Sequence, residues 1–346
     1  MISNSTKNLI MSGYHKRRRQ HIVAVIVLLV LIFLLSIFML IYGNTIYSLD
    51  VIYRVLRGEE IEGAVFTIKT LRLPRMLTGI LAGMAFGMAG NTFQTLLRND
   101  LASPDIIGVT AGSGFAAVFC ILVLHMSGET VSVISLIAGL AVAVSIYLLS
   151  QGKSFSKVRL ILIGIGIQAM LRAGISFVLL KGAQYDVATA LRWLNGSLNG
   201  VQMDGVPSLF AVVIIGGFVL TLFGRHLKVM QLGDESATTM GVKVNIMYLV
   251  LILGAVFLVA FATSITGPIA SVAFLSGPIA SRLVGKSGVN TISAGLVGAL
   301  LVLAADLVGQ YALGTRYPAG VITGVLGAPY MLFLLVRVNS KGGNGS

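Results

Sequence analysis

Few side chains in this sequence could carry out a chemical reaction. Cys120 is the only cysteine, and the four histidines have no metal-ligand spacing: His15, His21, His125 and His226. The sequence has no paired carboxylates, no serine-histidine-aspartate arrangement and no zinc-protease helix. These absences predict that the chain is not an enzyme and binds no metal ion through its own side chains.

Two ionisable residues stand out because they fall inside long apolar runs. Arg172 follows Gln168 by four residues, so both side chains project from one face of a helix, and Asp306 lies in another run. A charge in a bilayer costs about 2.5 to 3.5 kcal/mol on insertion scales, so each needs water or a partner. Two interpretations stay open. Gln168 and Arg172 line a hydrated pathway, or Arg172 is paired structurally, with Asp306 or with backbone carbonyls.

A second group of residues surrounds the apolar run that begins near residue 73. Arg72 and Arg75 flank a proline at its start, where a missing N–H costs nothing in the first turn of a helix. Gly79, Gly83 and Gly87 follow at intervals of four and predict a narrow face for close helix packing. The run ends in a polar loop over residues 98–105.

The composition indicates which elements hold these residues. Of the 346 residues, 56% are hydrophobic and only 11% are charged, far below the quarter that is usual for globular proteins. Runs long enough to cross a bilayer predict an all-α membrane protein with ten transmembrane helices. The expected spans are 22–42, 73–90, 106–126, 131–150, 158–180, 206–224, 244–262, 264–284, 291–313 and 319–337. Pro268 and Pro278 predict that the span over 264–284 is broken.

The distribution of charge predicts the orientation. Basic residues at 16–19 precede the first span, which has no small-residue cleavage site and is therefore interpreted as a retained helix. With that end in the cytoplasm, nearly all of the net charge of +13 falls on the inner side. We expect a cytoplasmic tail over 1–21, a polytopic domain over 22–338 and a cytoplasmic tail over 339–346. Orientation accounts for the basic pI without nucleic-acid binding.

Two loops are long enough to hold helices of their own. The outer loop over 43–71 mixes acidic and basic residues and predicts a solvated cap with a short helix. In the inner segment over 225–243, Asp234 is expected to cap a helix from Glu235 to Met240, which Gly241 ends. Such a helix in the cytosol is interpreted as a docking element, although an ordinary amphipathic loop helix would have the same spacing.

Several motifs in order along the chain resemble one transport family. They are Arg72-Leu73-Pro74-Arg75, Asn99-x-Leu101-Ala102-x-Pro104 followed by Gly108-Val109, Leu232-Gly233-Asp234-x-x-Ala237-x-x-x-Gly241, Ala305-Asp306-Leu307, and Pro318-x-Gly320-Val321-x-Thr323-x-x-Leu326-Gly327-Ala328-Pro329. The chain resembles the FecCD-type permeases of ABC importers, which take up iron-siderophores, haem and vitamin B12.

The resemblance implies a type II importer permease with partners. These are a second permease subunit, two cytosolic ATPase subunits that bind ATP and Mg²⁺, and an extracytoplasmic binding protein. It implies that Arg72 and Arg75 face outward and dock the binding protein. A third basic position falls on Gln310, for which Arg316 can substitute. It also implies ATPase coupling through 225–243, with Leu232, Gly233, Asp234, Glu235, Ala237 and Gly241, and a cytoplasmic gate loop with Asn99, Leu101 and Pro104.

Departures from the family pattern bear on the subclass. Asp100 stands where the family commonly has proline, and Gly277-Pro278 replaces a usual Pro-His pair. The chain is most similar to the second subunit of heterodimeric ferric-siderophore importers in a bacterial cytoplasmic membrane, with iron liganded by the siderophore. The alternatives are a haem or vitamin B12 importer of the same family, a homodimeric assembly, or an ion-coupled secondary transporter that needs no ATPase.

Overall fold

A computed structural model describes residues 4–151, 156–285 and 290–342, and these residues contain helices and no strands. The longer helices, in chain order, are α1 (Asn4–Ile41), α3 (Leu73–Leu97), α4 (Val109–Leu122), α5 (Glu129–Ser150), α6 (Lys157–Lys181), α8 (Gly205–Leu222), α11 (Val244–Thr266), α12 (Val272–Val284), α13 (Thr291–Tyr311) and α14 (Ala319–Gly342). Shorter helices are α2 (Leu49–Leu56), α7 (Gln184–Leu194), α9 (Gly224–Met230), α10 (Asp234–Thr239), the π-helix η1 (Phe66–Arg72) and the 3₁₀-helix η2 (Pro104–Ile107).

The ten longer helices correspond one by one to the ten predicted spans. Seven helical stretches in the described residues are long and apolar enough to cross a membrane: α1, η1 with α3, α5, α6, α8, α11 and α13. The shorter apolar helices α4, α12 and the first part of α14 complete the set. The predicted all-α membrane protein is therefore confirmed.

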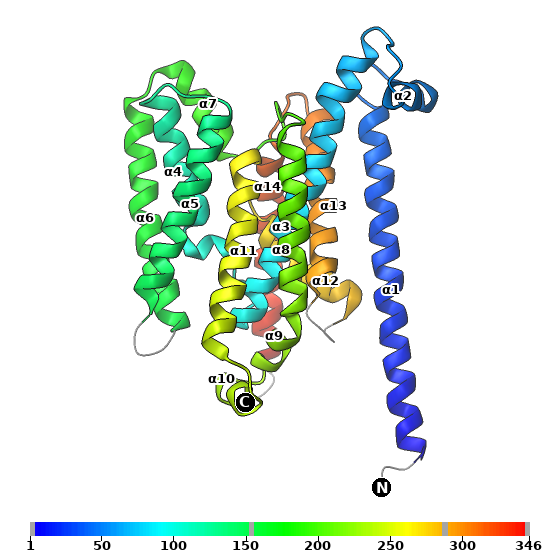
Figure 1. Ribbon diagram of the computed structural model, residues 1–346, viewed down its shortest axis with the longest axis vertical. Coiled ribbons are helices and arrows are strands. Elements are labelled where there is room, and N and C mark those ends of the chain that lie inside the picture. Colours follow the sequence, from blue (N-terminus) through cyan, green and yellow to red (C-terminus); the bar gives the residue numbers. More distant parts are fainter. Residues whose placement is uncertain (1–3, 152–155, 286–289, 343–346) are drawn as a thin grey trace.

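The molecule has two distinct ends, which Figure 1 shows at the top and the bottom. The end with α2 and α7 is called the α7 end below, and the end with α9 and α10 is called the α10 end. α1 begins and α14 finishes toward the α10 end. Helix α1 starts at Asn4 and α14 runs to Gly342, so much of each expected tail continues a membrane helix.

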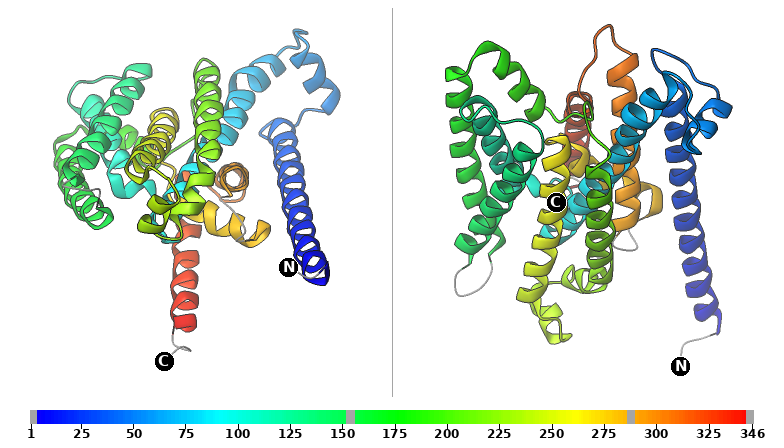
Figure 2. Two further views of the ribbon diagram at one scale, coloured as in Figure 1. Left: turned by 60° about the horizontal axis from the view of Figure 1, so that its bottom comes forward. Right: turned by 45° about the horizontal axis from the view of Figure 1, so that its top comes forward.

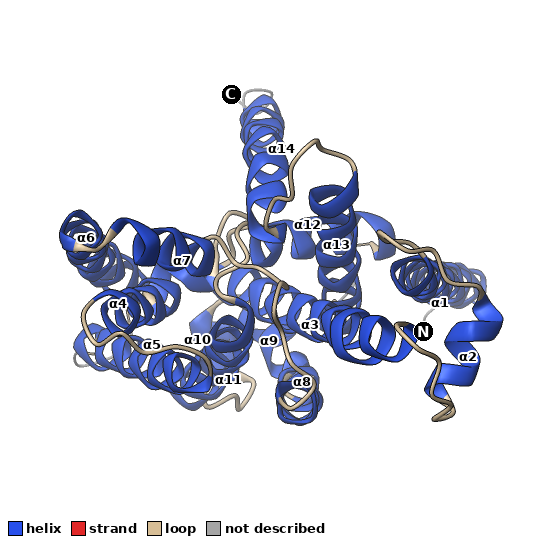
Figure 3. Ribbon diagram, turned by 90° about the horizontal axis from the view of Figure 1, so that it is seen from above, coloured by secondary structure: helices blue, strands red, loops and turns tan. Residues whose placement is uncertain are grey.

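Helix α3 lies at the centre of the helix arrangement (Figure 3) and is the most buried span. A Cβ atom at Gly83 would lie 2.5 Å from the carbonyl oxygen of Gly298, and one at Gly87 would lie 2.2 Å from that of Ala294. Both carbonyls belong to α13, so the two backbones are nearly in contact. The predicted packing face is confirmed.

Pro74 predicted that a helix begins near Arg72. In the structure, α3 instead continues the π-helix η1 without a break. Pro74 has no N–H to offer the carbonyl four residues before it. The chain adopts the wider turn instead, in which the N–H of Leu73 donates to the carbonyl of Ile68, five residues back. The helical stretch from Phe66 to Leu97 is consequently longer than expected.

The predicted broken span is confirmed, and the break lies between α11 and α12. Gly267 (φ +69°) and Ser271 (φ +63°) adopt left-handed backbone conformations there. Pro278, in contrast, lies inside α12 without ending it. Its ring frees the carbonyl of Phe274, and the side-chain amide of Gln94 on α3 donates to that carbonyl at 2.9 Å.

Two groups of helices lie at the outer sides of the molecule, as the views in Figures 1 and 2 show. Helices α4, α5, α6 and α7 form a group on one side, and α1 stands at the opposite side with α2. Only 6% of the apolar window of α6 and 17% of that of α1 are buried. These two helices therefore present most of their surface to lipid or to other subunits.

Candidate functional site

Arg72 holds the end of α1. Its guanidinium donates to the carbonyls of Leu40 (2.6 Å), Ile41 (2.9 Å) and Thr45 (2.6 Å). Carbonyls at a helix C-terminus have no partner within the helix, and the guanidinium supplies one. The side chain is buried, with 9% exposure. In the single subunit its donors are thus engaged with α1 and the turn that follows it, and the docking role of Arg72 stays a prediction.

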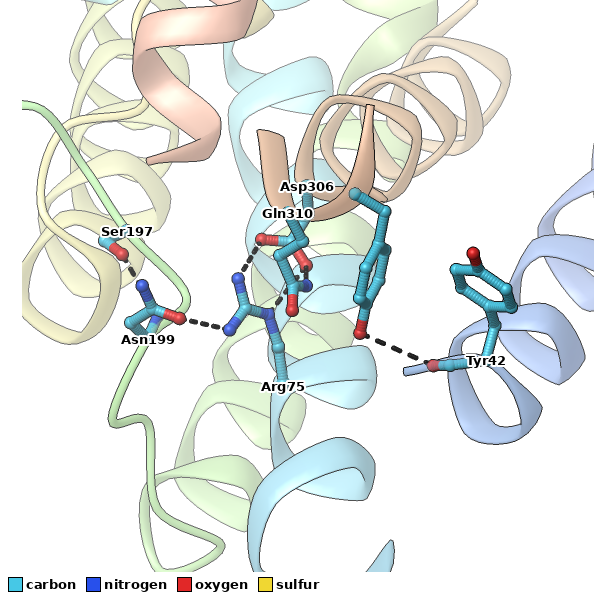
Figure 4. A network of polar contacts seen from close by, with 7 residues as sticks. Tyr42, Arg75, Ser197, Asn199, Asp306 and Gln310 are labelled. Atoms are coloured by element: carbon cyan, nitrogen blue, oxygen red, sulfur yellow. Dashed lines mark hydrogen bonds and ion pairs between the residues drawn. The ribbon is translucent and has the colours of Figure 1, made fainter. Parts of the chain in front are cut away.

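Arg75 is paired within the subunit at the α7 end. Its Nε and Nη2 atoms each lie 2.7 Å from a carboxylate oxygen of Asp306 on α13, and its Nη1 atom donates to Asn199 (Figure 4). The amide of Gln310 donates to the same carboxylate at 2.7 Å. The Asp306 side chain is fully buried and that of Arg75 is 14% exposed. The suggested pairing of Asp306 with Arg172 is wrong, since Arg75 takes both carboxylate oxygens.

Arg316 differs from the other two arginines of the expected docking set. It lies in the connection between α13 and α14, its side chain is exposed, and it donates to the Asn44 side chain at 2.8 Å. Gln310, where the family resemblance placed a basic residue, is occupied with Asp306. Arg316 is thus the only one of the three predicted docking arginines with an exposed side chain.

At the α10 end, the carboxylate of Asp234 joins four elements. Arg98, the residue that follows α3, donates to it at 3.0 Å, and the Tyr248 hydroxyl of α11 lies 3.0 and 3.1 Å from its two oxygens. The ammonium of Lys157, at the start of α6, lies 3.8 Å away and 5.2 Å from the centre of the Tyr248 ring. We call Arg98, Lys157, Asp234 and Tyr248 the Asp234 cluster.

The predicted short helix is present, but Asp234 does not cap it. Gly233 (φ +123°) occupies the cap position, and Asp234 is the first helical residue, so its side chain is free to enter the cluster. Arg98 adopts a left-handed conformation (φ 54°) at the end of α3 and also donates to the carbonyl of Met230 in α9. Gly241 (φ +82°) follows the helix as expected.

Around this anchor, the predicted coupling residues divide into a buried and an exposed set. Ala237 is fully buried against the core, whereas Leu232 is 66% exposed; Met240, which was not among the predicted coupling residues, is 63% exposed. Glu235 is also exposed, and it lines a groove of about 670 Å³ with Asp234 and the first turns of α11. An exposed apolar and acidic surface is thus fixed to the membrane helices by Asp234.

The loop that was predicted to form a gate lies between α3 and η2. The Asn99 side chain accepts the N–H of Leu101 at 2.9 Å, which closes a tight turn. Leu101 packs against Phe274 and Leu275 of α12, and Pro104 is buried as the first residue of η2. The loop therefore connects the Asp234 cluster, through Arg98, with the short helix α12.

The two predicted pathway residues, Gln168 and Arg172, both lie on α6 but contact different parts of the molecule. Gln168 lies beside Gly108, where a Cβ atom would be 3.7 Å from its side chain. Arg172 is exposed and lines a cavity of about 490 Å³ together with Asp105, Thr110 and Ser271. No ion pair of Arg172 is found within the described residues.

Comparison with known protein families identifies the family of this chain. The family model described as the FecCD transport family matches residues 27–337, which include every candidate residue named above. The chain belongs to the FecCD transport family. It is therefore a permease of an ABC importer, as the motifs predicted.

Relatives in the FecCD family carry names for several substrates. The chain is 34% identical over 323 residues to the Fe(3+)-citrate import system permease protein YfmE of Bacillus subtilis, covering 92% of this chain and 96% of the relative. It is 33% identical over 291 residues to the ferric enterobactin transport system permease protein FepG of Escherichia coli, covering 84% and 88%. It is 31% identical over 277 residues to the cobalamin import system permease protein BtuC of Halobacterium salinarum, covering 79% and 74%.

Among solved structures, the fold resembles that of a protein described as a metal-chelate type ABC transporter in an inward-facing conformation. The TM-score is 0.79 at 24% identity, and the alignment covers 90% of this chain and 97% of the other. This likeness shows that the two chains share a fold.

The site contains residues that the sequence reasoning did not bring together. Lys157 and Tyr248 in the Asp234 cluster, and Asn199 beside Arg75, carried no signal of their own in the sequence. Asp306 carried one, because a buried carboxylate must have a partner, but the partner could not be identified from spacing.

Proposed function

We propose that this chain is a permease subunit of an ABC importer that moves ferric siderophores across a bacterial cytoplasmic membrane, with the α10 end in the cytosol. The observation that carries the proposal is the Asp234 cluster, which fixes an exposed helix to three membrane helices at one end of the molecule. A surface of this kind suits a partner protein that moves the membrane helices. The excess of basic residues favours the cytosolic side for the α10 end.

The assembly that we infer contains four kinds of subunit. The exposed surfaces of α6 and α1 leave room for a second permease subunit. A heterodimer is favoured, because two of the relatives, FepG and FepD, are separately named permeases of the ferric enterobactin system of Escherichia coli. Two cytosolic ATPases and an extracytoplasmic binding protein complete it.

The ATPase would dock on the exposed face of α10. Leu232, Glu235 and Met240 offer apolar and acidic contacts there. A displacement of α10 reaches α3 through Arg98 and reaches α6 through Lys157, because both cations bind the same carboxylate. The loop with Asn99, Leu101 and Pro104 moves with the end of α3, which would open or close the cytosolic side of the pathway.

The binding protein would dock at the α7 end. Arg316 is the basic residue that we assign to this contact, since Arg72 is committed to α1 and the charge of Arg75 is balanced by Asp306. We propose that the chain itself holds no cofactor. ATP and Mg²⁺ belong to the ATPase, and the iron arrives within its siderophore.

The proposal is tested by rebuilding the importer in liposomes. The chain is combined with the second permease, the ATPase and the binding protein encoded with it, and uptake of ferric siderophore, haem and cobalamin is measured with and without ATP. We expect ATP-dependent uptake of the ferric siderophore only. Preferential uptake of cobalamin or haem would favour the alternative suggested by the Halobacterium relative. Uptake by this chain alone, driven by an ion gradient, would overturn the importer assignment.

A further inference from the structure

A polar stripe runs along one face of α6. Gln168, Arg172 and Ser176 recur every four residues and therefore project from one face of the helix. Between Arg159 and Lys181, near the two ends of the helix, the exposed residues on the other faces are apolar, among them Leu162 and Phe177. A stripe of this kind in a membrane helix indicates a face that meets water or a polar partner.

The charge of Arg172 lies at membrane depth. It comes 15 residues after the start of α6 at Lys157 and 9 before its end at Lys181, or about 22 Å and about 14 Å along the helix. The side chain is exposed in the subunit, and no carboxylate lies within ion-pair distance in the described part of the chain. Facing lipid, this charge would have no compensation, so the stripe must face an aqueous path, an anion or a polar group of the second permease subunit.

The cavity beside Arg172 has polar side chains in part of its wall. The hydroxyl-bearing residues Thr110, Ser176 and Ser271 line it, and α12 begins next to Ser271. The positive end of the α12 dipole adds to the potential that Arg172 creates. The volume of about 490 Å³ belongs to one subunit alone.

One carboxylate, that of Asp105, also lines the cavity. It accepts a hydrogen bond from the Ser103 hydroxyl at 3.0 Å and forms no ion pair with Arg172. Gly164 packs against the carbonyl of Ile106, next to Asp105, and precedes Arg172 by two helical turns. The carboxylate therefore lies nearer the α10 end, and an anion that enters from the α7 end meets Arg172 first.

We propose that Arg172 selects the cargo by charge, so that the pathway favours ferric chelates with net negative charge over neutral ones. This inference rests on the proposed function and specifies its substrate class. The five N–H donors of the guanidinium suit carboxylate or catecholate oxygens. Fe³⁺ bound by citrate or catecholates carries net negative charge, whereas Fe³⁺ bound by three hydroxamates is neutral and gains nothing from Arg172.

The test compares binding of two chelates to the assembled importer in nanodiscs, without the binding protein. Radio-iron-labelled ferric citrate and a neutral ferric trihydroxamate are titrated against the wild type and the Arg172→Gln, Arg172→Lys and Lys181→Gln variants. We expect Arg172→Gln to weaken ferric citrate binding about tenfold or more and to leave trihydroxamate binding unchanged. Arg172→Lys should retain most of the affinity for ferric citrate. Lys181→Gln, which removes a charge from the same helix outside the cavity, should match the wild type.

Three outcomes would overturn the inference: equal loss for both chelates in Arg172→Gln, unchanged binding of ferric citrate, or a wild type that binds neither. Parallel uptake assays separate this inference from the proposed function. A wild type that prefers ferric citrate but does not import it with ATP would overturn the importer assignment and leave the charge selection standing.

Discussion

At the scale of single residues, the arginines that flank Pro74 have different partners although they lie three positions apart. Arg72 binds carbonyls of α1 and the following turn, and Arg75 binds a carboxylate of α13. Both guanidinium groups are engaged with other helices of the subunit, whereas the Arg316 side chain is exposed. Charge reversal at Arg72 therefore tests the attachment of α1, while charge reversal at Arg316 tests docking.

These two reversals should give opposite results. In Arg72→Glu, a carboxylate would face carbonyl oxygens at the end of α1, and leaving a buried charge uncompensated costs about 3 to 5 kcal/mol. We expect a clear drop in the thermal unfolding temperature of the purified subunit. Arg316→Glu should leave that temperature within the error of the wild type and weaken binding-protein affinity several-fold.

Titration of the binding protein against the assembled importer measures the second effect. A stable Arg72→Glu variant, or an Arg316→Glu variant with normal affinity for the binding protein, would contradict this division of roles.

The residues at membrane depth were identifiable from the sequence, but their partners were not. Arg172 and Asp306 stood out because charge is rare in apolar runs. The partner of each residue depends on how α3, α6 and α13 are arranged in space, and spacing along the chain does not contain that information. Arg75, which the family resemblance assigned to docking, is the partner of Asp306 within the subunit.

At the scale of elements, the close contact of α3 and α13 depends on glycine. We expect Gly87→Ala to destabilise the subunit by about 1 to 3 kcal/mol, the usual effect of overpacking, because its Cβ would lie 2.2 Å from a backbone oxygen. Gly166→Ala on α6 is the matched control, since nothing lies within 4 Å of its added methyl group. Thermal unfolding of both variants in the same detergent makes the comparison. Equal stability of the two variants would show that α3 can move away from α13 without loss of stability.

Hydropathy and the spacing of glycine and proline predicted most of the elements. The ten spans, the packing face of α3 and the break before α12 all follow from apolar length and backbone freedom. The helix α7 was missed because its eleven residues are polar enough to resemble a loop. The effect of Pro278 was overestimated. Gln94, on a helix far away in the sequence, donates a hydrogen bond to the carbonyl that the proline leaves without a partner.

At the scale of the whole molecule, the Asp234 cluster links the cytosolic surface that we propose with the membrane helices. Asp234→Asn keeps the shape of the side chain but removes the charge that holds Arg98 and Lys157. We expect the ATPase to bind the variant and hydrolyse ATP, while uptake per ATP hydrolysed falls about tenfold, since the exposed contacts of α10 remain. Asp50→Asn on α2, which removes a carboxylate at the opposite end of the molecule, is the control.

Uptake and phosphate release measured in the same liposomes give the uptake per ATP hydrolysed. Full uptake by Asp234→Asn would exclude a role in transmission. Complete loss of ATPase binding would assign Asp234 to the docking surface itself.

The contacts of Arg72 and Arg75 also have a consequence for how the chain is made. Arg72 reaches a carbonyl 32 residues earlier in the chain, so its contact can form as soon as the second span leaves the ribosome. Arg75 must wait for a carboxylate that is synthesised 231 residues later. During most of translation, α1 is thus already secured while α3 carries an unneutralised cation. We expect truncated chains that lack α13 to insert correctly and yet to be recognised and degraded as unfinished.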